Sequence, residues 1–214
     1  MNLPRKHKLI TRLVIPIWLA VVSVLTLRLV SYSSTPGIAG HPPSKWPIAS
    51  HIVRISHDPT LIMMLHPRCP SARASLTELS ELLARVHTPV HAIILFVKPA
   101  STADDWVRTD IWNTAVSLPH VTVVVDRNGT ESQTFDSHTS GQVILYGTND
   151  ELLFTGGITI ARGHTGDNEG RQALIKQLTG QPTESVQTAV FGCPLLSDRD
   201  LGNRTKEERR GSHK

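Results

Sequence analysis

A chain of 214 residues is long enough for one domain of ordinary size together with a terminal anchor or tail. Its formal net charge of +4 comes from the two ends of the chain. Five basic residues precede Leu29, and the segment from Asp198 onward has six basic and four acidic residues. Residues 29–197 therefore hold 11 basic and 14 acidic residues, a slightly negative balance. This balance argues against nucleic acid as a partner of the folded part, and two cysteines without a Cys-x-x-Cys motif exclude a disulfide scaffold or a zinc site of ordinary spacing.

An apolar segment near the N-terminus predicts a membrane anchor. Fifteen uncharged residues, Leu13 to Leu27, lie between two arginines, and apolar neighbours extend the run to residues 10–30. Residues 1–12 carry four basic groups and no acidic one, so this end is expected to stay in the cytoplasm while the rest is exported. We therefore expect one uncleaved transmembrane signal anchor in the lipid bilayer of the cytoplasmic (inner) membrane, with the domain on the periplasmic side. A cleaved signal peptide, with a small-x-small site at Gly37-Ile38-Ala39, is the alternative.

Composition divides the remaining chain into three parts. Residues 31–50 are rich in Ser, Pro and Gly and are expected to form a flexible linker. Residues 51–182 carry the regularly spaced apolar segments of a folded domain. Residues 183–214 form a mostly polar C-terminal tail, interrupted by the apolar segment Phe191–Leu195, which contains Cys193.

Within residues 51–182, apolar periodicity predicts strands that alternate with helices. Strands are expected over 61–65, 90–97, 121–125, 142–146 and 151–155, and helices over 71–87, 104–116 and 168–178. The first three strands are joined through helices, which makes them parallel neighbours, whereas the Gly147-Thr148-Asn149-Asp150 turn makes the last two an antiparallel hairpin. The expected fold class is α/β, a compact sandwich of helices on a mixed sheet.

One cysteine stands where the first expected strand ends and the first helix begins, in the segment His66-Pro67-Arg68-Cys69-Pro70-Ser71. The unpaired N–H groups in the first turn of a helix carry roughly half a positive charge, which lowers the pKa of a thiol and populates the thiolate. His66 and Arg68 are placed to add to this field, and Pro70 suits the first helical position. Cys69 is therefore a candidate reactive thiol; the alternative is a small buried side chain, which is common for free cysteine.

The segment His66–Leu76 resembles the redox-site segment of the bacterial membrane-anchored, thioredoxin-like proteins called RedB. Further stretches match those proteins in the same order: Trp106, Thr109–Trp112, Val123–Asp126, Ser140–Gln142, Leu153–Thr159, Arg162–Asn168 and Val190–Leu195. The resemblance implies a thioredoxin-like three-layer sandwich with a mixed central sheet, preceded by one N-terminal transmembrane helix. It also implies thiol-disulfide exchange or electron transfer through Cys69, with a protein thiol or disulfide as the partner and no cofactor.

Two positions depart from the family pattern. Relatives place a second cysteine two residues after the first, where this chain has Ser71, and thioredoxins hold a cis-proline where Gly141 falls. With no local partner for Cys69, Cys193 becomes the candidate resolving thiol, 124 residues later. A structural disulfide, or a tail cysteine that pairs between chains, is the alternative. The supporting positions on this interpretation are His66, Pro67, Arg68, Pro70, Ser71, Gly141 and His164.

Two histidines have competing interpretations. His164 lies in a glycine-containing loop and is placed to shuttle protons or to bind a metal, but loop hydrogen bonding, with Asp167 as the cap of the following helix, is the simpler interpretation. His66 is placed to polarise Cys69 or to supply a metal ligand beside it. Two alternatives to a redox protein follow: an interaction domain without redox activity, since the second loop cysteine is missing, and a copper-handling module like the Sco proteins of the same fold superfamily.

Overall fold

The computed structural model describes residues 5–54, 58–184, 186–197 and 200, and the chain divides into two units, Met1–Thr35 and Pro36–Lys214. The first unit is the single helix α1 (Arg5–Ser34). Its segment Val14–Ser34 has a mean hydropathy of 2.1 and no buried residues, so it is long and apolar enough to cross a membrane. The helix continues past the expected end of the span at residue 30.

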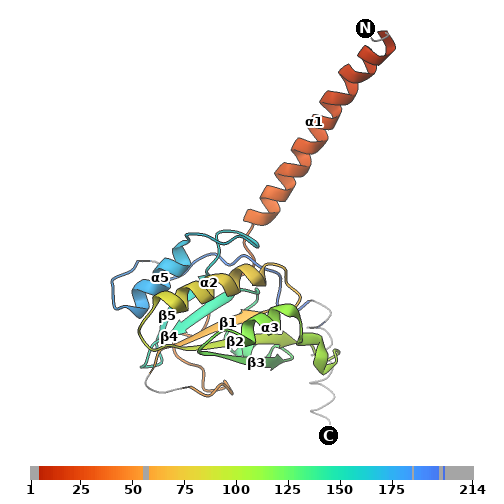
Figure 1. The fold of residues 1–214 in the computed structure, drawn as a ribbon. Helices are drawn as coiled ribbons and strands as arrows, with labels where there is room; N and C mark the ends of the chain where they lie inside the picture. The colour runs from red at the N-terminus through yellow and green to blue at the C-terminus, as the bar shows by residue number, and fades with distance from the viewer. Residues whose placement is uncertain (1–4, 55–57, 185, 198–199, 201–214) are drawn as a thin grey trace. The chain divides into compact units, whose positions relative to one another are not determined.

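The second unit is built on a five-stranded sheet of order β3-β2-β1-β4-β5 (Figure 1). The strands are β1 (Thr60–Leu65), β2 (His91–Lys98), β3 (Val121–Arg127), β4 (Gln142–Tyr146) and β5 (Leu152–Gly157). β1, β2 and β3 are parallel neighbours, whereas β4 runs antiparallel to both β1 and β5. The central strand β1 is fully buried, which explains why its sequence is a continuous apolar run rather than an alternating one.

Three helices pack on one face of this sheet: α2 (Ala72–Arg85), α3 (Asp110–Val116) and α5 (Glu169–Leu178) (Figure 1). Their apolar side chains share one buried cluster with alternate residues of the strands. Members of the cluster include Met63, Leu76, Leu79, Phe96, Ile111, Val143 and Leu174. The periodic apolar positions read from the sequence are thus the core positions of the helices.

The other face of the sheet is covered by the chain that follows α1, by the short helix α4 (Thr130–Thr134) and by the C-terminal segment. The ring of Trp46 packs edge-on against Phe135 at 5.1 Å and against Tyr146 at 5.3 Å. The Tyr146 hydroxyl donates to the carbonyl of Pro43 at 2.8 Å, and the backbone N–H of Trp46 donates to the carbonyl of Asp150 at 2.9 Å. The expectation of a flexible linker over residues 31–50 is therefore wrong from Pro36 onward, because Trp46 buries apolar area that outweighs the coil preference of its neighbours.

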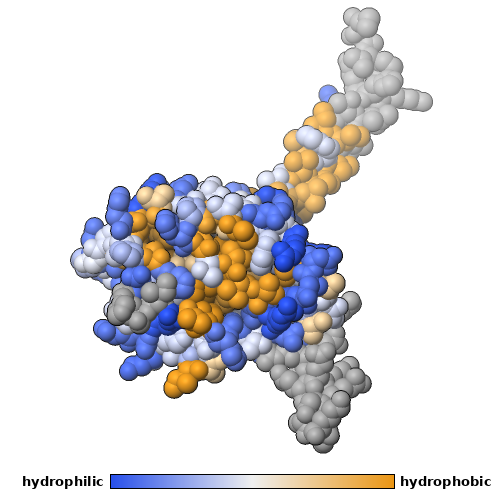
Figure 2. All heavy atoms as spheres, turned by 60° about the horizontal axis from the view of Figure 1, so that its bottom comes forward, coloured by the Kyte–Doolittle hydropathy of each residue, from blue (hydrophilic) through white to orange (hydrophobic). Residues whose placement is uncertain are grey.

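Apolar side chains gather on one side of the domain inside a border of polar ones (Figure 2). On the face of the sheet opposite the three helices, a groove of about 610 Å³ is lined by Ile52, Ile93 and Val124. The edge strand β3 is thus only partly covered on this face.

The expected thioredoxin-like sandwich with a mixed central sheet and one N-terminal apolar helix is confirmed. Three local expectations need correction. The helix expected over 104–116 is divided into a 3-10 turn, Asp104–Val107, and α3, because the Thr109 hydroxyl accepts the N–H of Trp112 and caps a new helix. Helix α4 was not expected from the sequence. Helix α5 is capped by Asn168 rather than Asp167.

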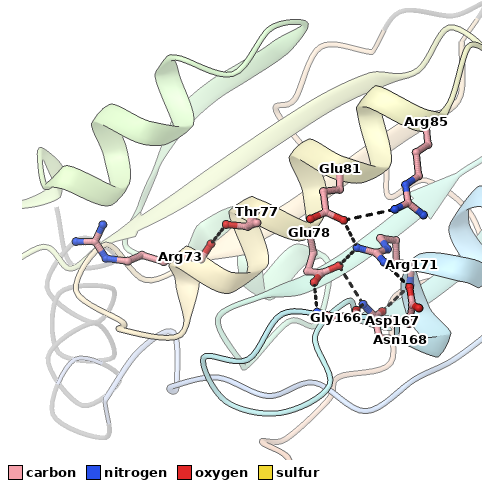
Figure 3. A network of polar contacts seen from close by, with 9 residues as sticks. All are labelled: Arg73, Thr77, Glu78, Glu81, Arg85, Gly166, Asp167, Asn168 and Arg171. Carbon is pink, nitrogen blue, oxygen red and sulfur yellow. Dashed lines mark hydrogen bonds and ion pairs between the residues drawn. The ribbon is translucent and has the colours of Figure 1, made fainter.

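A buried network of charged side chains joins α2 to α5 (Figure 3). Glu78 of α2 has no exposed surface, and its carboxylate pairs with the guanidinium of Arg171, which is 2% exposed. Arg171 also pairs with Glu81 and, at 3.0 Å, with Asp167. The buried Glu78 carboxylate depends on Arg171 for its counter-charge, whereas Arg171 also has Glu81 and Asp167.

The same network fixes the loop before α5. Glu78 accepts the backbone N–H of Gly166 at 2.7 Å and the side-chain amide of Asn168 at 3.1 Å (Figure 3). Asn168 in turn accepts the N–H of Arg171 at 2.8 Å as the cap of α5. The loop over residues 158–168 is therefore held to α2 by a carboxylate, in addition to Ile158, which lies in the apolar cluster.

We predict that Arg171→Met lowers the free energy of unfolding by about 3–5 kcal/mol, because it leaves the buried Glu78 carboxylate without a counter-charge. Glu78→Gln should cost less, because Arg171 keeps its ion pairs with Glu81 and Asp167. The double variant should lose less than the sum of the two, with a coupling energy within about 0.5–3 kcal/mol. Urea unfolding of the full chain in detergent, followed by tryptophan fluorescence, measures these values. Arg85→Gln, which removes an exposed partner of Glu81, is the control and should change stability by less than about 0.5 kcal/mol. Additive losses would contradict the role given to the network.

Candidate active site

Two tight turns carry the chain from β1 to α2 and place Cys69 between them. The Cys69 N–H donates to the carbonyl of His66 at 3.0 Å, and the carbonyl of Cys69 accepts the N–H of Ala72 at 3.1 Å. Ser71 is the N-cap of α2, so Pro70 lies one residue before the cap and not at the first helical position that the sequence predicts. Because residues 66–71 form these two turns, α2 begins only at Ala72.

The sulfur of Cys193 lies 2.9 Å from the sulfur of Cys69, and both cysteines are free thiols. The backbone N–H of Cys193 also points at the Cys69 sulfur, 3.4 Å away. The C-terminal segment thus docks on the domain and brings together two cysteines that the sequence separates by 124 positions.

Backbone hydrogen bonds on both sides of Cys193 hold its segment, residues 190–195, against the chain that precedes β4. The Ser140 N–H donates to the carbonyl of Cys193 at 2.8 Å, and the Leu195 N–H donates to the carbonyl of His138 at 2.9 Å. Gly192 is required here, because a Cβ at this position would lie 1.8 Å from the carbonyl oxygen of Ser140. The domain therefore includes residues 190–195, beyond the boundary at residue 182 that the sequence predicts.

Arg162 adds a charged contact to the same segment. Its guanidinium donates to the carbonyl of Gly192, directly before Cys193. Arg162 belongs to the loop that Glu78 fixes through Gly166, so the buried charge network and the Cys193 segment are linked through one loop.

The hypothesis of a reactive thiol requires a sulfur open to solvent, but Cys69 is fully buried, as in the alternative interpretation of a small buried side chain. Cys193, which is half-buried, lies in contact with it, and the apolar cluster of the helical face includes Cys69 on the other side. Burial alone would favour the neutral thiol, so the charge state depends on the hydrogen bonds that the sulfur receives.

Those hydrogen bonds lower the pKa of Cys69 to about 5. The largest contribution is the hydrogen bond from the Cys193 thiol; burial opposes it, and the N–H groups of Cys193 and Ser71 and the Ser140 hydroxyl add to it. The same sulfur–sulfur contact, together with burial, raises the pKa of Cys193, and only the charge of Arg162 acts in the other direction. The pair is thus asymmetric: Cys69 is the thiolate at neutral pH and Cys193 the thiol.

His66 and Arg68, which the sequence suggests as a source of positive charge, have other contacts. The His66 ring accepts the N–H of Arg68 at Nδ1, 3.1 Å away, and lies edge-on to Trp106 at 5.4 Å. Burial, ahead of the opposing charge of Cys69, lowers the pKa of His66, so its ring is neutral at pH 7. The Arg68 guanidinium stacks over Trp106 at 5.0 Å. The contacts of His66 and Arg68 with Trp106 thus fix the conformation of the loop that carries Cys69.

The other predicted supporting residues, Pro67, Gly141 and His164, have structural roles in their loops. The carbonyl of Pro67 accepts the hydroxyl of Thr109 at 2.9 Å, which ties the loop to α3. Gly141 has φ +93, and a Cβ there would lie 2.7 Å from the Ser75 hydroxyl, so only glycine fits. His164 is exposed and its ring bonds to the carbonyl of Arg162 at 2.7 Å, the loop hydrogen bonding that was the simpler interpretation.

Within the described part of the chain, no three His, Cys, Asp or Glu side chains gather into a metal site.

No family model matches this chain, and no curated protein does. Among solved structures, an uncharacterized conserved protein from Geobacillus kaustophilus is 16% identical, with a TM-score of 0.54 over 77% of this chain and 93% of that protein. A hypothetical protein from Sinorhizobium meliloti 1021 is 13% identical, with a TM-score of 0.53 over 76% and 96%. The exposed lipoprotein thioredoxin of Streptococcus pneumoniae strain TIGR4 is 15% identical, with a TM-score of 0.43 over 58% and 86%.

The domain has the thioredoxin-like fold. The unit β1-α2-β2 followed by β4, β5 and α5 is the core of that fold, and Cys69 lies at the junction of its first strand and helix. At identities below 20%, the likeness concerns the fold alone.

Three residues of the site were not predicted as site residues: Ser140, Arg162 and Gly192. Ser140 and Arg162 act through a hydroxyl and a guanidinium brought in from distant loops, and nothing in their local sequence indicates a contact with Cys69 or Cys193. Gly192 had a weak signal, because a glycine directly before a cysteine in an apolar segment suggests a close backbone approach.

The thiolate absorbance of the reduced full chain near 240 nm should titrate with a midpoint near pH 5, owing to the donors around Cys69. Cys193→Ala removes the largest of those donors and should raise the midpoint by more than one pH unit. Cys69→Ser should abolish the transition altogether. A midpoint at or above about 8.5 in the unmodified chain, the value of a free thiol, would contradict the activation of Cys69.

Proposed function

We propose that this chain is a membrane-anchored thiol-disulfide exchange protein whose redox pair is Cys69 and Cys193. The observation that carries the proposal is the 2.9 Å between their sulfurs at the N-terminus of α2. In the proposed reaction the two thiols and one disulfide interconvert with loss or gain of two electrons, while a partner protein undergoes the reverse change.

The chemistry of the two sulfurs supports this function. Exchange requires a thiolate, and Cys69 is ionised at neutral pH because four donors surround it. The second sulfur is already in place. This chain has Ser71 where the RedB proteins have their second cysteine, but Cys193 of the C-terminal segment supplies the second thiol of the pair.

The N-terminal helix supports the location. One apolar helix preceded by basic residues is typical of a single-pass anchor with a cytoplasmic N-terminus. We propose that α1 holds the domain at the exported, periplasmic side of the cytoplasmic membrane, as in the RedB proteins that the sequence resembles. Disulfides persist in such compartments.

The sulfur–sulfur contact also favours the redox function over the two alternatives, an interaction domain without redox activity and a copper-handling module. An interaction domain without redox activity has no need of two thiols held in contact by hydrogen bonds on either side. A copper-handling module calls for Cu(I) held by these sulfurs, and a reduced chain that retained Cu(I) against a moderate chelator would support it over exchange.

Mild oxidation of the reduced full chain in detergent should form an intramolecular Cys69–Cys193 disulfide that dithiothreitol reverses. Non-reducing digestion and mass spectrometry would identify the linked peptides. Cys69→Ser and Cys193→Ser are matched controls and should give no such cross-link. A chain that stays fully reduced, or that forms only disulfides between molecules, would refute the proposal.

The ionised state of Cys69 also sets the pH dependence of the reduction potential. Above pH 5, reduction takes up two electrons and one proton because Cys69 stays a thiolate; below pH 5 it takes up two protons. The potential should therefore fall by about 30 mV per pH unit above pH 5 and by about 59 mV below it. Equilibration with dithiol buffers from pH 4 to 8 measures both slopes. Ser140→Ala, which removes one donor, should move the break to higher pH; a slope of about 59 mV throughout would contradict an ionised Cys69.

A further inference from the structure

The two sulfurs differ in access, and this difference sets the order of events in the proposed exchange. We infer that a partner's thiol attacks Cys193 of the oxidised chain and releases Cys69, so that the chain passes its disulfide to reduced protein dithiols. This inference rests on the proposed function and reverses the order that the sequence suggests, in which Cys69 meets the partner first.

Access to Cys69 is blocked from every direction. Its side chain has no exposed surface, and the apolar cluster under α2 encloses it on the side of the domain core. Towards solvent it meets the thiol and the backbone N–H of Cys193. Cys193 itself is half-buried and is followed by the exposed Pro194, so it is the sulfur of the pair that a macromolecule can reach.

The segment that covers Cys69 is fixed in place. Hydrogen bonds hold it on both sides of Cys193, from Ser140 and to His138, and Arg162 holds the residue before it. Buried Val190 and Leu195 anchor its two ends. Exposing Cys69 would require these contacts to break together, whereas attack on Cys193 requires none of them to break.

The step balances as an ordinary exchange. The partner's thiolate forms a bond to the Cys193 sulfur, the Cys69–Cys193 bond breaks, and Cys69 leaves as a thiolate. The partner's second thiol, after losing its proton to solvent, then attacks the partner's own sulfur in the mixed disulfide and expels Cys193, which takes up a proton. The partner is oxidised to a disulfide and the chain is reduced by two electrons.

The charge state of the product favours this direction. A thiol of low pKa is the better leaving group, and Cys69 leaves into a site already lined by the N–H groups of Ser71 and Cys193. Stabilising the reduced form makes a pair more oxidising, which is the property of a disulfide donor.

The test is the position of the first bond. The oxidised full chain in detergent is mixed at pH 7 with an unfolded synthetic peptide that contains one cysteine. Within seconds the mixture is quenched in concentrated urea with excess N-ethylmaleimide, which unfolds the chain so that the released cysteine is alkylated, and the products are mapped by mass spectrometry. We expect the peptide on Cys193 and the maleimide on Cys69 in at least a tenfold excess over the opposite arrangement. The same experiment in concentrated urea is the control, because unfolding removes the difference in access and should bring the ratio close to one.

Arg162→Met provides a second measurement. Losing the contact with Gly192 loosens the covering segment, so the share of peptide found on Cys69 should rise while the disulfide still forms. Peptide found mainly or equally on Cys69 of the folded chain would overturn the inference and leave the proposed exchange function standing. Failure to form the disulfide at all would refute the proposed function and the inference with it.

Discussion

The contact between the sulfurs of Cys69 and Cys193 is the constraint on which the chemistry of this domain depends. Burial alone would keep Cys69 neutral, and a neutral buried thiol neither attacks nor leaves readily. The hydrogen bond from the Cys193 thiol, with two N–H groups and one hydroxyl, outweighs that burial and lowers the pKa to about 5. Moving Cys193 away would remove both the proposed redox partner and the main cause of ionisation.

Several distant parts of the fold keep that contact in place. The Cys193 segment bonds to the chain before β4 and to Arg162, and the Arg162 loop is fixed by the buried pair of Glu78 and Arg171. The chain after α1 joins the same assembly, since the Gly37 N–H donates to the carbonyl of Val190. The site therefore depends on tertiary contacts between segments far apart in sequence, and not on one loop.

This arrangement explains which features could be predicted from the sequence. Strands β1, β2 and β4 and helix α2 follow from apolar periodicity, and the place of Cys69 follows from the junction between β1 and α2. Residues 36–50 were misjudged because Ser, Pro and Gly indicate a coil, while the packing of Trp46 depends on a sheet face that no local pattern reveals. The same limit applies to Arg162 and Ser140, whose contacts come from elements paired only after folding.

A disulfide between residues 69 and 193 would enclose strands β2 to β5 and helices α2 to α5 within one covalent loop, with the central strand β1 outside it. Closing a loop of more than about 100 residues removes enough freedom from the unfolded chain to add about 4–5 kcal/mol to stability. Because cleavage by proteases follows the population of opened molecules, the oxidised protein should persist much longer than the reduced one in a compartment rich in proteases. In the proposed exchange, each turnover would thus pass through a state more vulnerable to degradation, and the supply of oxidant would govern the abundance of the protein.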